Sequence, residues 1–138
     1  MGSNPTSSAR DMKTILVDAV GTFVIEGEVV FREMHDLLET FPNRKIVLTG
    51  ASDEQFKKFG LDRMPYEVFT LKHNPEKTDP KYYEIMLEHF GLGKDDVLYF
   101  EHDKGAVKSA QSVGIKTHYY DSDKKDLEAL KNFLRKNL

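Results

Sequence analysis

The chain has 138 residues, of which 39% are hydrophobic and 31% are charged, and its net charge is −3. These values are typical of one globular domain with a single core. They exclude a strongly basic surface of the kind that binds nucleic acid, and no apolar run approaches the ~20 residues of a membrane-spanning helix. Because cysteine is absent, disulfides, thiol catalysis and thiolate metal sites are excluded, and a cytoplasmic location is favoured.

The first residues differ in composition from the rest of the chain. Residues 1–12 begin with the small, polar run MGSNPTSSAR, which lacks the apolar core of a secretory signal. We predict that this segment is disordered or is a remnant of recombinant expression, and that one domain spans residues 13–138.

Short apolar runs alternate with helical patterns along this domain. The runs predict five strands, at 14–17, 45–49, 66–70, 96–100 and 116–120. Strands and helices that alternate in this way form a parallel sheet with helices on both faces. We therefore predict an α/β, three-layer Rossmann-like fold with a five-stranded parallel sheet.

Helices are expected after each of the first four strands and at the end of the chain. Apolar residues at helical spacing predict a helix from Met34 to Phe41, just before Pro42. The other helices are predicted from their capping residues. These are Ser52 with Gln55 as a capping box, Asp79-Pro80 at the start of a helix that Gly91 ends, Asp103 at the start of the next, and Asp123 at the start of the last.

Two β-prone segments follow the first strand. Phe23-Val24-Ile25 and Val29-Val30-Phe31 flank Glu26-Gly27, a pattern typical of a small β-hairpin. Such a hairpin would form a flap beside the end of the first strand, or it would only pack at the edge of the sheet. Its apolar side chains outnumber those that a two-stranded flap can bury, which predicts an exposed apolar patch and a possible homo-oligomer.

The first strand delivers a single carboxylate, Asp18, to its carboxyl end, where Gly21 turns the chain. Open α/β sheets place their chemistry at the carboxyl ends of strands. A carboxylate there serves as a nucleophile or as a metal ligand. Many strands end in Asp, so this assignment depends on the segments that follow the later strands.

The order of four such segments resembles that of the haloacid dehalogenase-like (HAD-like) hydrolases, over nearly the whole chain from residue 13. In that superfamily the first strand ends in Asp-x-Asp-Gly-Thr and the second in a phosphate-binding Thr or Ser. A Lys then precedes a helix that starts with proline, and the fourth strand ends in paired acids. The matching segments here are Asp18-Ala19-Val20-Gly21-Thr22, Leu48-Thr49-Gly50, Lys77-Thr78-Asp79-Pro80 and Phe100-Glu101-His102-Asp103. The short gaps after the first two segments leave no room for a cap domain, so the resemblance is to the capless type.

The resemblance implies a hydrolase of phosphate esters. Asp18 would attack phosphorus and carry an aspartyl-phosphate intermediate. Lys77 would neutralise the charge shared by Asp18 and the transferred group. The hydroxyl of Thr49 and the amide of Gly50 would hold phosphate oxygens, together with Lys77.

The resemblance also implies Mg²⁺, bound by Asp18, by the backbone carbonyl of Val20, and by Glu101 or Asp103. If His102 faces the metal instead, the site has lost an oxygen ligand. For Asp103 the alternative is a plain helix N-cap. No metal-ligand spacing links the other histidines, which we interpret as surface or packing residues: His35, His73, His89 and His118.

The chain departs from the superfamily at Val20, which stands where phosphatases carry the second Asp. That Asp protonates the leaving group, which is worth roughly 10²–10⁴-fold in rate, so valine predicts a slow enzyme. One alternative is a HAD-fold binding or scaffold protein without turnover, and another is a hydrolase of non-phosphate bonds. The open site suits a large substrate such as a phosphorylated macromolecule, or closure by a neighbouring subunit.

Overall fold

In a computed structural model of the chain, residues 12–25 and 30–138 are described. Five parallel strands form one sheet in the order β3-β2-β1-β4-β5. In chain order they are β1 (Thr14–Asp18), β2 (Lys45–Thr49), β3 (Glu67–Thr70), β4 (Val97–Glu101) and β5 (Lys116–Tyr119). The predicted fold class is confirmed, and every strand boundary lies within one residue of its predicted position.

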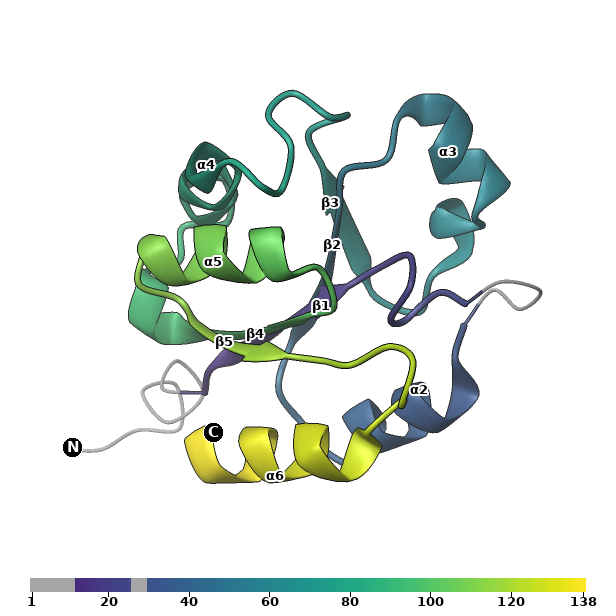
Figure 1. Cartoon of the computed structure of the whole chain (residues 1–138), viewed down its shortest axis with the longest axis vertical. Helices are drawn as coiled ribbons and strands as arrows, with labels where there is room; N and C mark the ends of the chain where they lie inside the picture. Colours follow the sequence, from purple (N-terminus) through teal and green to yellow (C-terminus); the bar gives the residue numbers. More distant parts are fainter. Residues whose placement is uncertain (1–11, 26–29) are drawn as a thin grey trace, which may run out of the picture.

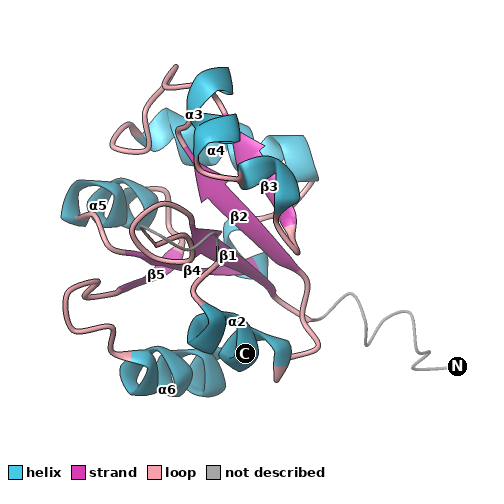
Figure 2. Cartoon of the chain, turned by 90° about the vertical axis from the view of Figure 1, so that its right-hand side faces the viewer, coloured by secondary structure: helices cyan, strands magenta, loops and turns pink. Residues whose placement is uncertain are grey.

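Helices cover both faces of this sheet (Figures 1 and 2). On one face, α2 (Arg32–Glu39) and α6 (Leu127–Asn137) pack against Ile15 and Val17 of β1. On the other face, α4 (Pro80–Phe90) and α5 (Lys104–Ser112) pack against Leu16. Successive side chains of a strand point to opposite faces, so the uninterrupted apolar run of β1 supplies both cores. Three short helices complete the fold: α3 (Asp53–Lys58) and the 3₁₀ helices Leu61–Arg63 and Lys94–Asp96.

The predicted caps of α3, α4 and α5 are present. Ser52 and Gln55 form a reciprocal capping box at α3. Asp79 caps α4, Pro80 is its first residue, and Gly91 ends it with a left-handed φ of 67°. Capping of this kind satisfies backbone amides and carbonyls that have no partner inside the helix, and it defines where each helix starts and ends.

The last helix starts later than predicted. It begins at Leu127 with Asp126 as its N-cap, so the prediction that Asp123 begins it is wrong. The carboxylate of Asp121 accepts from the backbone amide of Asp123 (3.0 Å), which forms a turn in place of a first helical turn. Lys125 then has a φ of 49°, a left-handed conformation that a right-handed helix excludes.

The predicted flap lies partly outside the described residues, because 26–29 are not described. In its described part the amide of Phe31 donates to the carbonyl of Phe23 (2.7 Å). Phe23, Val24 and Phe31 are all less than 10% exposed and belong to the core on the α2 face. The prediction of an exposed apolar patch is wrong for these three residues, so they give no support to a homo-oligomer. The absence of a cap domain stays a prediction.

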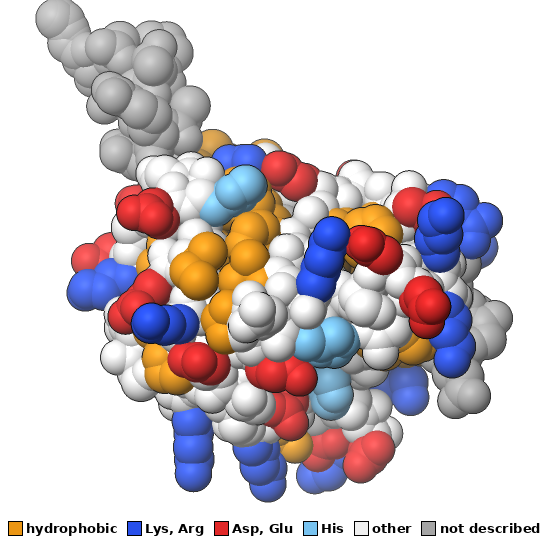
Figure 3. Space-filling view, turned by 90° about the horizontal axis from the view of Figure 1, so that it is seen from above, with side chains coloured by type: hydrophobic (Ala, Val, Ile, Leu, Met, Phe, Trp, Pro, Cys, Tyr) orange, Lys and Arg blue, Asp and Glu red, His pale blue; other side chains and the backbone are white. Residues whose placement is uncertain are grey.

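Acidic and basic side chains are interspersed on the face of the molecule seen from above (Figure 3). That face carries no extended field of a single sign. Within the described ranges, no helix has the length and apolar character needed to cross a membrane.

The strand order places one edge of the sheet where a ligand site is expected. The chain moves outward from β1 to β2 and β3, and then returns to β4 on the other side of β1. Open α/β sheets bind ligands at the carboxyl ends of the strands where the order reverses in this way. Asp18 ends β1, Glu101 ends β4 and Thr49 ends β2, so these three of the predicted site residues lie at this edge.

Candidate active site

Asp18 lies at the centre of the site and is only 1% exposed. Its Oδ1 accepts a hydrogen bond from Lys77 Nζ (2.6 Å), and its Oδ2 accepts from the hydroxyl of Thr22 (2.7 Å) and the backbone amide of His102 (3.2 Å). Burial by itself would raise the pKa of Asp18, but the charge of Lys77 and the hydrogen bond from His102 outweigh it and hold that pKa well below its usual range. Asp18 is therefore an ionised carboxylate at the edge of the sheet.

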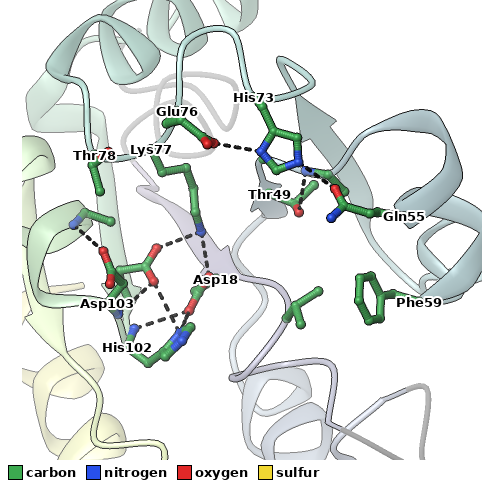
Figure 4. Close-up of a pocket in the computed structure, with 15 residues that line it drawn as sticks. Asp18, Thr49, Gln55, Phe59, His73, Glu76, Lys77, Thr78, His102 and Asp103 are labelled. Carbon is green, nitrogen blue, oxygen red and sulfur yellow. Dashed lines mark hydrogen bonds and ion pairs between the residues drawn. The ribbon is translucent and has the colours of Figure 1, made fainter.

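Lys77 joins the two buried acids of the site (Figure 4). Its ammonium lies 2.6 Å from Asp18 Oδ1 and 2.7 Å from Glu101 Oε1, and its side chain is 16% exposed. Burial alone would lower the pKa of Lys77, but the charges of Asp18 and Glu101 prevail and raise it. The segment that carries Lys77 is fixed because Asp79, two residues later, caps α4.

Glu101 is fully buried, and its two oxygens have different partners. Oε1 accepts from Lys77 and from the hydroxyl of Tyr99, while Oε2 accepts from the backbone amide of Asp103 (3.0 Å). The carboxylate of Asp103 in turn accepts from the amide of Ala106 (2.9 Å), so it is the N-cap of α5. The N-cap alternative for Asp103 is the arrangement that the structure shows.

His102 lies beside Asp18 Oδ2, the carboxylate oxygen that does not contact Lys77. Its Nδ1 lies 2.5 Å from Asp18 Oδ2 and 3.4 Å from Glu101 Oε2. Hydrogen bonds to Asp18 and then to Glu101 raise the pKa of His102 to about 10. This approach depends on Gly21, which has a φ of 94°. A Cβ at position 21 would lie 2.8 Å from the His102 ring.

The ligand atoms of Asp18, Glu101 and His102 lie within 4.8 Å of one another, close enough to share one cation. This is the one such cluster in residues 12–25 and 30–138. The metal set predicted from the sequence was Asp18, Val20, Glu101 and Asp103. The structure brings the first and third together, while His102 and not Asp103 supplies the third side chain of the cluster.

A cavity of about 440 Å³ opens in front of Asp18 and Lys77. Thr49 and Gly50 line it, as the sequence predicts for residues that hold phosphate, and the Thr49 hydroxyl accepts from the amide of Ala51 (3.1 Å). Val20 also lines the cavity and is 37% exposed, but its side chain has no proton to give.

Sequence reasoning missed two groups that help to build the site. Tyr99 is a buried residue of β4. Its hydroxyl donates a hydrogen bond to Glu101 Oε1 and lies 3.4 Å from Lys77 Nζ. A tyrosine in a buried strand signals core packing, so nothing in the pattern pointed to this contact. The second group is His73 with its neighbours, which lines the same cavity. From the sequence alone His73 is a surface or packing residue, because it has no partner at metal-ligand spacing.

Comparison with solved structures identifies the fold. A HAD family enzyme from Bacteroides thetaiotaomicron, solved with magnesium and inorganic phosphate, superposes with a TM-score of 0.65 at 12% identity, over 80% of this chain and 95% of that chain. This chain has the HAD-like fold. A HAD-superfamily hydrolase from Geobacter sulfurreducens matches with a TM-score of 0.51 at 22% identity, over 70% of this chain and 53% of its own.

An uncharacterized protein from Corynebacterium glutamicum shares the HAD-like fold of this chain with a TM-score of 0.59 at 17% identity, over 88% of this chain and 95% of that chain. No protein-family profile and no curated protein sequence matches this chain. At identities this low, the likeness concerns the HAD-like fold, and function has to be argued from the site.

Proposed function

We propose that this protein hydrolyses phosphate esters through Asp18, with an aspartyl-phosphate intermediate. One observation carries the proposal. A buried carboxylate is kept ionised by Lys77 at the floor of an open cavity, at the sheet edge where the strand order reverses. An ionised carboxylate with one lysine beside it is suited to attack phosphorus, because the lysine offsets the negative charge that two anions bring together.

The walls of the cavity support the same assignment. Thr49, Gly50 and Lys77 line the cavity, and we propose that the hydroxyl of Thr49 and the amide of Gly50 bind oxygens of the phosphate while Lys77 offsets the charge of the group in transfer. The enzyme from Bacteroides thetaiotaomicron, which has the same fold, is solved with magnesium and inorganic phosphate. The substrate class that we propose is accordingly a phosphorylated compound.

The residues at the carboxyl ends of β1 and β4 fit a divalent cation. Candidate ligand atoms of Asp18, Glu101 and His102 already lie within 4.8 Å of one another. We propose that Asp18, Glu101 and the carbonyl of Val20 would hold Mg²⁺, with Asp103 a further candidate through the oxygen that does not cap α5. When bound, the ion supplies positive charge against a phosphate oxygen. Because an imidazole stands among the oxygens, we expect weak binding of Mg²⁺.

Val20 makes the enzyme slow on esters with poor leaving groups. Its side chain faces the cavity at the position where a proton donor would serve the leaving group, and it has none to offer. Because Val20 is 37% exposed in an open cavity, the site is accessible to a large substrate, for which we propose a phosphorylated macromolecule.

The test measures phosphate release from acetyl phosphate, which has a good leaving group, and from ethyl phosphate, which has a poor one, with and without Mg²⁺. We expect the protein to hydrolyse acetyl phosphate faster, and Asp18→Asn to abolish both reactions. Val20→Asp should raise hydrolysis of ethyl phosphate by up to roughly 10²–10⁴-fold. In calorimetry, Mg²⁺ at millimolar concentration should give binding heat that Asp18→Asn removes.

Two results would overturn this proposal. The first is that the protein and Val20→Asp are both inert on these two compounds with Mg²⁺, which would favour a binding or scaffold protein without turnover. The second is that Asp18→Asn retains full hydrolysis, which would exclude Asp18 as the nucleophile.

A further inference from the structure

A second hydrogen-bonded group lies on the wall of the same cavity, outside the ion pairs of Asp18. His73 is at its centre, with Glu76 on one side and Gln55 on the other (Figure 4). His73 Nδ1 lies 2.8 Å from Glu76 Oε1, and its Nε2 lies 2.6 Å from Gln55 Oε1. None of these three side chains has a part in the proposed function so far.

The capping box of α3 establishes which atom of Gln55 faces the ring. Gln55 Oε1 also accepts from the backbone amide of Ser52 (2.9 Å), and an amide N–H can donate only to the oxygen of the side chain. The atom next to His73 Nε2 is therefore an acceptor, as is the carboxylate oxygen of Glu76 next to Nδ1. Both ring nitrogens therefore face acceptor oxygens, and each satisfies its partner only as an N–H donor.

The backbone at Lys72 and His73 has an unusual conformation where it brings this ring to the cavity wall. Lys72 and His73 have φ values of 53° and 66°, in the left-handed region that is unfavourable for residues with a Cβ. The hydroxyl of Thr70 stabilises this conformation, because it accepts from the amide of Lys72 (3.0 Å) and donates to the carbonyl of Ala51 (2.7 Å). Unfavourable backbone conformations that persist in this way cluster at functional sites.

This backbone conformation places His73 beside the segment proposed to bind phosphate. A Cβ added to Gly50 would lie 3.5 Å from His73 Nδ1 and 3.4 Å from Glu76 Oε1. The side chain of His73 is also 42% exposed, so the ring is open to a molecule that enters the cavity. A proton-bearing group thus lies next to the predicted phosphate position, in a cavity where Val20 has no proton to give.

We infer that His73 protonates the leaving group, in place of the acid that Val20 lacks, and that Glu76 positions its ring. This inference rests on the proposed function. In the first step Asp18 forms a bond to phosphorus, and the bond from phosphorus to the ester oxygen breaks. The ester oxygen replaces Gln55 Oε1 as the acceptor of the hydrogen bond from His73 Nε2, and it takes the Nε2 proton as it leaves. In the second step water loses a proton to His73 Nε2, bonds to phosphorus, and displaces the carboxylate of Asp18. Both Asp18 and His73 end in their starting states.

The experiment compares two substrates that differ in their need for a proton donor. Acetate leaves from acetyl phosphate without protonation, whereas ethoxide from ethyl phosphate requires it. We expect His73→Ala to lower kcat for ethyl phosphate by roughly 10²-fold or more, and kcat for acetyl phosphate by no more than about threefold. Added imidazole should restore part of the loss on ethyl phosphate, and Glu76→Gln should show a smaller loss with the same preference.

His89→Asn, an exposed histidine outside this cavity, serves as the control and should leave both reactions unchanged. Equal losses on the two substrates in His73→Ala, without rescue by imidazole, would show a structural role and overturn the inference. Hydrolysis of acetyl phosphate but not of ethyl phosphate by the unaltered protein would also overturn it, while leaving the proposed function in place. If the unaltered protein hydrolyses neither compound, both the proposed function and this inference fail.

Discussion

Lys77→Met tests whether the lysine holds the site together. The methionine side chain has similar length but carries no charge, so Asp18 and Glu101 would keep only one cationic neighbour between them, His102. Asp18 and Glu101 are buried, with side-chain exposures of 2% and 0%. Removing one partner of a buried ion pair leaves an uncompensated charge and costs about 3–5 kcal/mol of the free energy of unfolding. For a chain of this size the melting temperature should fall on the order of 10–20 °C.

The loss should depend on pH in a defined direction. With Lys77 present, the pKa of Asp18 is lowered, so its stabilisation is present above the ordinary value of 3.8 and is lost only as the pH falls. Without Lys77, burial and the repulsion between Asp18 and Glu101 favour binding of a proton. The variant therefore gains from acidification, and its deficit relative to the unaltered protein should be smaller at pH 5 than at pH 7.

The assay is urea unfolding of both proteins at pH 5 and pH 7, followed by circular dichroism. Lys108→Met, an exposed lysine of α5, is the control and should change the free energy of unfolding by no more than about 0.5 kcal/mol. The double variant Lys77→Met/Asp18→Asn should recover part of the loss, because one of the two buried charges is gone. A loss below about 1 kcal/mol at pH 7, or a deficit that grows on acidification, would refute the reasoning.

Two further predictions concern stability. Asp79→Ala removes the N-cap of α4 and should lower the free energy of unfolding by about 1 kcal/mol in urea, with Asp79→Asn as a control that retains the cap; equal losses in both variants would contradict the capping role. His102 has a pKa raised to about 10 from 6.5, so the stability that it contributes is fully present below pH 6.5 and is lost as the pH rises to about 10. In metal-free protein, unfolding midpoints should fall across this window, and His102→Asn should remove this part of the decline; an unchanged decline in the variant would exclude His102 as its source.

The elements of the fold are predictable from the sequence, because the signals for them are local. The alternation of apolar runs with helical patterns is enough for a parallel α/β sheet, and caps such as Ser52 and Asp79 lie next to the helices that they begin. Local reasoning failed at Asp123, where the carboxylate of Asp121 and the left-handed Lys125 form a turn that no periodicity reveals. The candidate acid Asp18 is predicted from the strand that it ends together with the order of the segments that follow the later strands.

The contacts between the site residues follow from the tertiary structure, since these residues are far apart in the chain. Lys77 is 59 residues from Asp18 and 24 from Glu101, and the register of β1 with β4 brings all three together. In the same way, His73 meets Gln55 across 18 residues because β3 ends and α3 begins at the same edge of the sheet. A sequence pattern indicates which residues end strands. The sheet order and the direction of each side chain decide which of those residues form hydrogen bonds or ion pairs with one another.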